Sequence, residues 1–394
     1  VPTGAGKTAS AVLGWLWRRM GGMGSEVQQK TPRRLIYCLP MRTLVEQTYS
    51  NVQYYLQNLS LQSANPDQPG YIGLCTIMGG SNSDDWVLYP ESDAIIIGTQ
   101  DMLLSRALNR GYGTSRFQWP FLFGLINNDC LWVIDEIQLM GSGLATSAQL
   151  EAFRKSFGVR GSAQTIWMSA TAEPAWLKTV DHSIPYSEDV LTLSDSDRSG
   201  SLSQRLSANK ILQRCPVSLE GSKEKALPKN AAKLTYEVIS HHVPGTLTLV
   251  IINSVKKAKA VFEALQANKE KGQIKAEIML VHSRFRAYER KCLNEQLTQV
   301  VEAGVDISAR TLYTELAPWA SVVQRLGRLN RFGKYPRAEA WWIDVSDKDE
   351  LPYTREELAT ARDILMDLEG QSVAPNDLPS VNLPYDPRNV IRKR

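Results

Sequence analysis

Close to its amino end the chain reads Gly4-Ala5-Gly6-Lys7-Thr8, a glycine-rich turn followed by a cation and a hydroxyl. Glycines let backbone N–H groups close around phosphate oxygens, the lysine neutralises their charge, and the threonine hydroxyl can hold Mg²⁺. The complete pattern has a further glycine, where this chain has Val1. A short glycine turn before a helix is the alternative interpretation. We predict that nucleotide phosphates bind at Thr3, Gly4, Ala5, Gly6, Lys7 and Thr8.

A pair of carboxylates follows an apolar run further along the chain. Leu131-Trp132-Val133-Ile134 leads into Asp135-Glu136-Ile137-Gln138. In a parallel sheet the carboxyl end of such a strand lies beside the phosphate loop. We therefore expect Asp135 to bind Mg²⁺ together with Thr8, and Glu136 to polarise the water that attacks the γ-phosphate. Alone, such a pair is about as often a solvated strand end. In this order, the two motifs predict a nucleoside triphosphatase using ATP and Mg²⁺.

Length and composition indicate a globular protein with several domains. The chain has 394 residues, which suggests two or three domains of roughly 150 residues each. Its hydrophobic content of 43% allows a large core, and no apolar run approaches the ~18 residues of a membrane span, so no membrane partner is expected. Five cysteines without C-x-x-C spacing fit a reducing compartment and argue against structural zinc. Because the net charge is only +4, any nucleic-acid groove must be a local basic patch.

The two ends of the sequence suggest a segment of a longer protein. The chain begins at Val1, already inside the phosphate loop, so the buried strand that normally precedes such a loop is missing. It stops at Arg394 without a turn or cap signal. We expect further parts on both sides.

Apolar runs that end in small or polar residues alternate with amphipathic stretches. This pattern predicts an α/β fold with parallel sheets. In the first half we expect helices over 9–20 and from 42 (with Thr43 as a possible N-cap) and 101, and strands over 34–39, 72–78, 94–100, 131–135 and 165–168. In the second half we expect strands over 246–252, 276–281 and 338–345 and a helix over about 255–268.

A change of composition separates the two halves. Residues 185–230 are rich in Ser, Asp, Arg and Lys, with a short strand candidate only at 190–193. Such a polar stretch is typical of a domain boundary. We predict a first domain over 1–190, a linker over 191–235 and a second domain over 236–394.

The order of motifs along the chain matches a known family pattern. PTGAGKT, DEIQ, SAT, EAGVD and QRLGRLNR follow one another over nearly the whole sequence. This order resembles the superfamily 2 helicases, in which two RecA-like (P-loop NTPase-type) domains share one ATP. The runs at 39–48 and 300–308 look most like the CRISPR-associated helicase–nuclease of type I interference systems. The stretch 93–150 is similar to the type I-G/I-U branch, whose nuclease domain is separate or C-terminal.

The resemblance implies an enzyme: a translocase that moves 3′→5′ along single-stranded DNA in prokaryotic antiviral defence. It also implies a cytoplasmic location, a guide-RNA surveillance complex as partner, and a nuclease fused to the chain or separate from it. Two alternatives remain. One is an RNA helicase of the same superfamily, and the other is a nucleotide-gated nucleic-acid-binding module without turnover.

Several residues take roles through this resemblance. Arg328 and Arg331 are three positions apart, so a helix would present both on one face. They resemble the arginine fingers that reach the γ-phosphate, with Gln324 beside them; a solvated basic helix face is the alternative. Gly304 and Asp306 resemble the motif that contacts the ribose or links to the arginine motif. The alternative is that these two residues form an ordinary turn. Ser169 and Thr171 resemble the motif that couples ATP to DNA grip, and otherwise form an ST-turn.

Small polar residues after the strands are the expected track for single-stranded DNA, because hydroxyls, amides and backbone N–H groups contact phosphate without reading bases. An ordinary loop cap is the alternative for each residue. The expected contacts are Arg42, Thr43, Gly98, Thr99, Gln100, Asn253, Ser254, His282, Ser283 and Arg284.

The chain departs from the family pattern in two places. No His-Asp nuclease signature is present, because His182 follows Asp181 in the wrong order and His241-His242 lacks acidic neighbours. We therefore predict no nuclease activity for this chain. The apolar strand expected before 298–301 is also missing, which we interpret as roughly a dozen absent residues. A Cα–Cα spacing of about 3.8 Å throughout 291–301 would contradict that interpretation.

Overall fold

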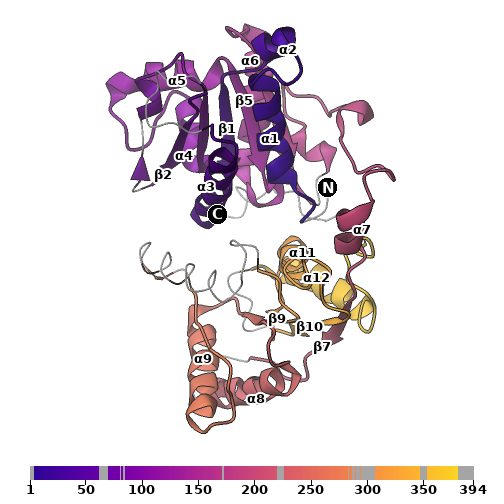
Figure 1. Cartoon of the computed structure of the whole chain (residues 1–394). Coiled ribbons are helices and arrows are strands. Elements are labelled where there is room, and N and C mark those ends of the chain that lie inside the picture. Colours follow the sequence, from indigo (N-terminus) through magenta and orange to yellow (C-terminus); the bar gives the residue numbers. More distant parts are fainter. Residues whose placement is uncertain are drawn as a thin grey trace. The chain divides into compact units, whose positions relative to one another are not determined.

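The computed structural model divides the chain into two compact units (Figure 1). Unit 1 runs to Thr192 and unit 2 from Leu193 to Val381. The structure describes residues 4–61, 70–79, 81–82, 85–170, 173–219, 226–282, 284–285, 289, 293, 307–346 and 353–379. Both units are built on parallel sheets, so the predicted α/β fold class is confirmed. Within the described residues, no helix combines the length and apolar character needed to cross a membrane.

Unit 1 contains a six-stranded sheet in the order β3-β2-β4-β1-β5-β6. Its strands are parallel except for the short β3, which runs antiparallel to β2. The carboxyl ends of the parallel strands therefore meet at one edge. The strands are β1 (Arg34–Leu39), β2 (Gly73–Met78), β3 (Ser81–Asn82), β4 (Ala94–Thr99), β5 (Cys130–Asp135) and β6 (Ala163–Met168), which confirms the expected strands of this half.

Helices cover both faces of this sheet. Successive residues of a strand point to opposite faces, and β1 divides accordingly between two cores. Leu35, Tyr37 and Leu39 pack with α1 and α3, whereas Ile36 and Cys38 pack with α4, α5 and α6. The helices are α1 (Lys7–Arg19), α2 (Ser25–Lys30), α3 (Arg42–Asn58), α4 (Gln100–Ala107), α5 (Trp119–Asn127) and α6 (Ser142–Phe157), with 3-10 turns η1 (Asp85–Val87), η2 (Arg116–Gln118), η3 (Ile137–Leu139), η4 (Pro174–Leu177) and η5 (Ser187–Asp189).

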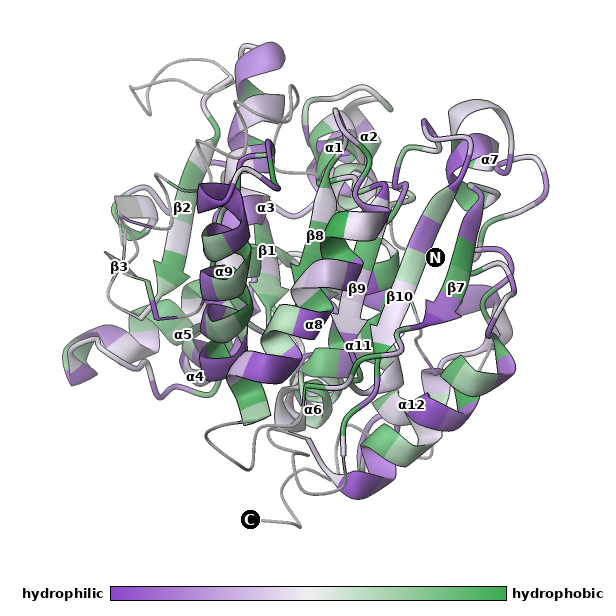
Figure 2. Ribbon diagram, turned by 90° about the horizontal axis from the view of Figure 1, so that it is seen from below, coloured by the Kyte–Doolittle hydropathy of each residue, from purple (hydrophilic) through white to green (hydrophobic). Residues whose placement is uncertain are grey.

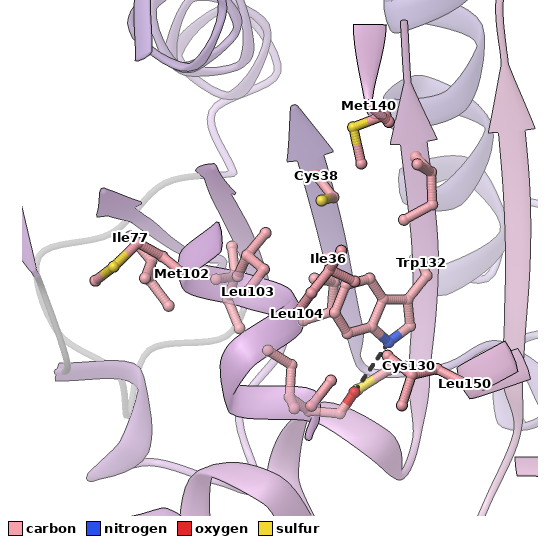
Figure 3. Packing of buried hydrophobic residues seen from close by; sticks show 14 of the residues in the cluster. Ile36, Cys38, Ile77, Met102, Leu103, Leu104, Cys130, Trp132, Met140 and Leu150 are labelled. Atoms are coloured by element: carbon pink, nitrogen blue, oxygen red, sulfur yellow. Dashed lines mark hydrogen bonds between the residues drawn. The ribbon is translucent and has the colours of Figure 1, made fainter. Parts of the chain in front are cut away.

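Trp132 is the most deeply buried tryptophan in the second of these cores. Its indole N–H donates to the carbonyl oxygen of Ile126 at 3.0 Å (Figure 3). A buried indole needs such a partner, because an unpaired N–H away from water is costly. The contact ties α5 to the strand that carries the acidic pair.

Unit 2 contains a four-stranded parallel sheet in the order β7-β10-β9-β8. Helices α8 and α9 pack on it around Leu234, Val261 and Tyr313. Hydrophilic and hydrophobic residues alternate along α8, α9 and α12 in Figure 2, as expected for helices with one solvated side. The elements are α7 (Gly200–Leu206), β7 (Lys210–Arg214), α8 (Ala226–His241), β8 (Thr248–Ile251), α9 (Val255–Glu270), β9 (Thr311–Glu315), α11 (Trp319–Leu326), β10 (Ala338–Ile343) and α12 (Arg355–Asp367).

Four local expectations are wrong. Residues 190–193 and 276–281 form no strand, because no described neighbour pairs with their backbone. The segment 191–235 is not simply a linker, since β7 pairs with β10 and α8 begins at Ala226. Thr43 does not cap α3; Met41 is the N-cap residue, without a side-chain hydrogen bond.

Candidate active site

The phosphate loop ends where α1 begins. Gly4 and Gly6 have φ angles of 82° and 86°, in the left-handed region that residues with a Cβ rarely adopt. Gly6 is the N-cap of α1 and supplies no side-chain hydrogen bond, and the first turn carries no acidic residue. No capping side chain and no acidic residue thus competes with an anion at this end of α1, and the helix dipole favours an anion there. Thr3 lies outside the described residues.

Thr8 and Asp135 converge on one buried hydroxyl. The Tyr37 hydroxyl lies 3.1 Å from Thr8 Oγ1 and 2.7 Å from Asp135 Oδ2. The other carboxylate oxygen, Asp135 Oδ1, accepts the backbone N–H of Glu136 at 2.8 Å. Hydroxyl and carboxylate oxygens are the hard ligands that Mg²⁺ prefers, and Mg²⁺ commonly takes one or two protein ligands besides phosphate and water. The oxygen set of Thr8 and Asp135 therefore fits this ion.

Burial governs the electrostatics of Asp135 and Tyr37. Burial, together with the neighbouring charge of Glu136, raises the pKa of Asp135 to about 6, while the Tyr37 hydrogen bond and the Lys7 ammonium act in the opposite direction. Burial and the Asp135 charge also raise the pKa of Tyr37 well above its ordinary value, so the phenol stays protonated. A site that makes an isolated carboxylate costly favours a bound cation, which restores the charged form.

The second carboxylate is held by a chain of side chains. Glu136 has a φ of 54°, unusual for a residue with a Cβ, and such strain often marks functional positions. The Gln138 amide donates to Glu136 Oε2 at 2.6 Å, and the Ser169 hydroxyl donates to Gln138 Oε1 at 2.6 Å. One amide group thus links the end of β6 to the acidic pair after β5. Thr171, the other residue expected to couple here, lies outside the described residues.

In unit 2, the helix expected to carry Arg328 and Arg331 ends too early. Helix α11 stops at Leu326, with Gly327 as its C-cap. Both arginines follow in a loop, in which Asn330 adopts a left-handed φ of 41° that excludes a helix through Arg331. The Arg328 carbonyl accepts the N–H of Ala309 at 2.9 Å, and the Arg331 N–H donates to Ser308 Oγ at 2.9 Å. The loop backbone is therefore anchored to the segment before β9.

Gln324 is half-buried in α11, Arg328 is exposed and Arg331 is half-buried. Gly304 and Asp306, expected to contribute to the same site, lie outside the described residues, as does most of 291–301.

A partly buried polar cluster joins α11 to the ends of β8 and β9. Arg325 donates to Thr314 Oγ1 at 3.0 Å, to the Glu315 carbonyl at 2.8 Å and to Asn253 Oδ1 at 2.9 Å. Asn253 donates its amide to the Leu316 carbonyl at 2.7 Å. The side chain of Asn253, an expected DNA contact, thus makes hydrogen bonds within unit 2.

The other expected nucleic-acid contacts divide into exposed and internal residues. Arg42 and Thr43 are exposed at the start of α3, and Arg284 is exposed in unit 2. Gly98 and Thr99 are buried in β4, where a Cβ on Gly98 would lie 2.6 Å from the Ile77 carbonyl, so neither presents a surface to a strand of DNA. Ser254 caps α9 by accepting the Lys257 N–H, His282 stacks on Phe285, Gln100 is half-buried, and Ser283 lies outside the described residues.

Three residues with roles in these contacts were not predicted. Gln138 and Arg325 belong to motifs already singled out, and their polar side chains next to predicted catalytic residues were a usable signal. Tyr37 is a hydroxyl side chain within the apolar run 34–39, and that exception was its only signal.

Comparison with known proteins agrees with the order of the motifs. The family described as DEAD/DEAH box helicase matches residues 1–180, and that described as CRISPR-associated nuclease/helicase Cas3, C-terminal, matches residues 244–334. The CRISPR-associated helicase Cas3 of Thermoproteus tenax is 29% identical over 136 residues, covering 31% of this chain and 22% of that protein. Among solved structures, T. fusca Cas3 with AMPPNP has a TM-score of 0.58 at 15% identity, covering 100% of this chain and 49% of that one. Mycobacterium smegmatis helicase Lhr, bound to ssDNA and AMP-PNP, has a TM-score of 0.56 at 16% identity, covering 95% and 46%.

The two structural matches establish the fold, and the chain spans about half the length of either protein. With the motif order and the DEAD/DEAH match, they define a superfamily 2 helicase core made of two RecA-like units. Within that class the chain is similar to the Cas3-like helicases, because a Cas3 family model and a Cas3 relative both match part of it by sequence. The expected family resemblance is confirmed.

Proposed function

We propose that this chain is the motor of a CRISPR type I interference helicase, driven by ATP and Mg²⁺. It moves 3′→5′ along single-stranded DNA and unwinds target DNA for a nuclease that is fused or separate. The observation that carries the proposal is the convergence of Thr8 and Asp135 at the start of α1, with Glu136 held beside them. A guide-RNA surveillance complex that has opened an R-loop supplies the DNA.

Each residue of the site has a distinct task. Lys7 and the N–H groups at the start of α1 bind the triphosphate, and Thr8 and Asp135 hold the metal. Bound Mg²⁺ supplies charge neutralisation at the β- and γ-phosphates. Glu136 orients the attacking water and accepts a proton from it. Arg328 and Arg331 stabilise the charge that develops on the γ-phosphate.

The link from Glu136 to Ser169 supports coupling between hydrolysis and DNA grip. A shift of the segment after β6 moves Gln138, and Gln138 is bonded directly to Glu136. Movement at this segment therefore changes the geometry of the catalytic carboxylate. Arg42, Thr43 and Arg284, which are exposed, remain the proposed phosphate contacts.

The test is the rate of ATP hydrolysis with single-stranded DNA, with single-stranded RNA and with neither. Stimulation by DNA supports the proposal, stimulation by RNA alone replaces it with an RNA helicase, and binding without turnover replaces it with a nucleotide-gated module. Unwinding of duplexes with a 3′ or a 5′ single-stranded tail tests the direction.

A matched pair of variants assigns the chemistry. Glu136→Gln keeps the shape of the side chain but cannot accept a proton, so turnover should fall by ~10²–10⁴ while ATP binding persists. Glu91→Gln, an exposed residue remote in sequence from the motifs, should leave turnover unchanged. Unchanged turnover in Glu136→Gln would remove this residue from its proposed role.

A further inference from the structure

Tyr37 occupies the centre of the unit 1 sheet. It lies in β1, whose neighbours on the two sides are β4 and β5, and its side chain is 0% exposed. The ring packs with the aliphatic side chains of the core that faces α1 and α3. A phenylalanine ring would meet the same packing requirement, and a buried hydroxyl is costly unless it is hydrogen-bonded. The hydroxyl therefore calls for an explanation beyond packing.

The two partners of this hydroxyl come from distant parts of the chain. Thr8 opens α1 and Asp135 ends β5, and each lies within hydrogen-bonding distance of the same phenol oxygen. A charged carboxylate can only accept, so the single phenol proton goes to Asp135. The hydroxyl of Thr8 then supplies the proton in the remaining contact. The result is a directed chain from Thr8 through Tyr37 to Asp135.

This direction has a consequence for the Thr8 oxygen. When its proton points at Tyr37, its lone pairs are left for another partner. The same chain holds the Asp135 carboxylate at one oxygen, while the backbone N–H of Glu136 holds the other. Both groups proposed to bind Mg²⁺ are thus oriented by protein contacts alone.

We propose that Tyr37 is a positioning residue that orients Thr8 and Asp135 for the divalent cation of the nucleotide site. This inference rests on the proposed function, because it assumes that these two residues hold the metal. Groups that orient metal ligands through hydrogen bonds typically contribute ~10–100-fold to metal affinity. Tyr37 touches neither phosphate nor water in this role and acts only through its two partners.

The test measures metal binding directly. Mn²⁺ is titrated into the full chain with saturating AMPPNP, and free Mn²⁺ is followed by electron paramagnetic resonance. Tyr37→Phe deletes one oxygen and keeps the ring, so we expect the dissociation constant for Mn²⁺ to rise ~10-fold or more. Affinity for a fluorescent ATP analogue without metal should stay within about twofold, because Lys7 and the α1 N-terminus are unchanged.

Tyr313→Phe is the matched control. Tyr313 is also 0% exposed, and its hydroxyl donates to the Glu237 carbonyl at 3.0 Å in unit 2. Both variants lose one buried hydroxyl and should lose comparable stability to urea, but only Tyr37→Phe should weaken Mn²⁺ binding. That difference separates positioning of the metal ligands from a purely structural role.

Three outcomes overturn the inference. Equal Mn²⁺ affinity in Tyr37→Phe and the unaltered chain rules out the orienting role. Loss of metal-free nucleotide affinity by the same factor as Mn²⁺ affinity means that Tyr37 shapes the whole loop instead. If the unaltered chain binds AMPPNP but no Mn²⁺ with it, both this inference and the proposed metal site fail.

Discussion

Ser169 donates a 2.6 Å hydrogen bond to the side-chain oxygen of Gln138, and through that amide it is connected to Glu136. Ser169 and Gln138 are both buried, so the contact between them does not compete with bulk water. Hydrogen bonds in such surroundings are stronger, and their loss is costlier, than at the surface. The acid that we propose to orient water is thus fixed by the segment after the neighbouring strand.

Replacing Gln138 with glutamate should disrupt that arrangement. The variant Gln138→Glu loses the N–H donor and places a second negative charge against Glu136. A misplaced catalytic group commonly costs ~10²-fold in rate, and we expect that loss in ATP turnover with nucleotide affinity nearly unchanged. Steady-state hydrolysis and nucleotide titration measure the two quantities. Gln164→Glu, an exposed residue on β6, is the control; an equal loss there would contradict the interpretation.

The two arginines of the unit 2 loop should act on turnover rather than on folding. Arginine fingers supply ~10³–10⁵ in rate, so Arg328→Ala and Arg331→Ala should each reduce DNA-stimulated hydrolysis by at least ~10²-fold. Arg337→Ala serves as the control, since the exposed side chain of Arg337 forms an ion pair with Glu339. Normal hydrolysis in both loop variants would show that neither arginine is a finger. The positive charge that stabilises the γ-phosphate would then have to come from another residue.

Lys257 should be important for the stability of unit 2. Its ammonium donates to Glu315 Oε1 at 2.8 Å, and the Glu315 side chain is only 1% exposed. The variant Lys257→Met leaves a buried carboxylate without its cation, which typically costs about 3–5 kcal/mol. Hydrogen exchange of β8 and β9 amides measures the effect within unit 2. Lys256→Met changes an exposed neighbour on the same helix and should cost less than ~0.5 kcal/mol.

Lys210 should make the stability of unit 2 depend on pH. It is 1% exposed and donates to the Leu326 carbonyl, and burial, together with the Arg331 charge, lowers its pKa to about 8. A pKa near 8 instead of 10.5 means that the charged form costs about 3 kcal/mol in the folded unit. Lys210→Met removes that cost and loses one hydrogen bond of about 1 kcal/mol, so it should stabilise unit 2 by about 2 kcal/mol at pH 7.

The sign of the pH dependence follows from the two pKa values. Between pH 8 and 10.5 the unfolded chain holds the Lys210 proton that the folded unit has released, so the unaltered protein gains stability as pH rises. The advantage of Lys210→Met should therefore shrink across that range. Urea unfolding at several pH values measures it, with exposed Lys229→Met as the control. A constant difference from pH 7 to 10 would show that Lys210 has an ordinary pKa.

Local sequence was sufficient for the strands of the unit 1 sheet that are buried on both faces, and for the residues next to them in the chain. The runs that became β1, β4 and β5 are almost entirely apolar, as strands buried on both faces must be, and the motifs that follow them are contiguous. The run 276–281 is similarly apolar, but no described strand pairs with it. Strand β7 is short and contains both polar and apolar residues, and it forms a strand because its backbone pairs with β10.

The residues themselves thus predicted Lys7, Thr8, Asp135 and Glu136 as parts of one phosphate site, because a backbone cradle and a strand-end acid are short-range patterns. Only the folded chain decided which side chains orient them. Tyr37 meets Asp135, and Arg325 meets Asn253, across separations of 98 and 72 positions. Hydrogen bonds of this kind depend on which strands lie side by side and on the direction of each side chain in the sheet. Neither property is encoded in the spacing of residues along the chain.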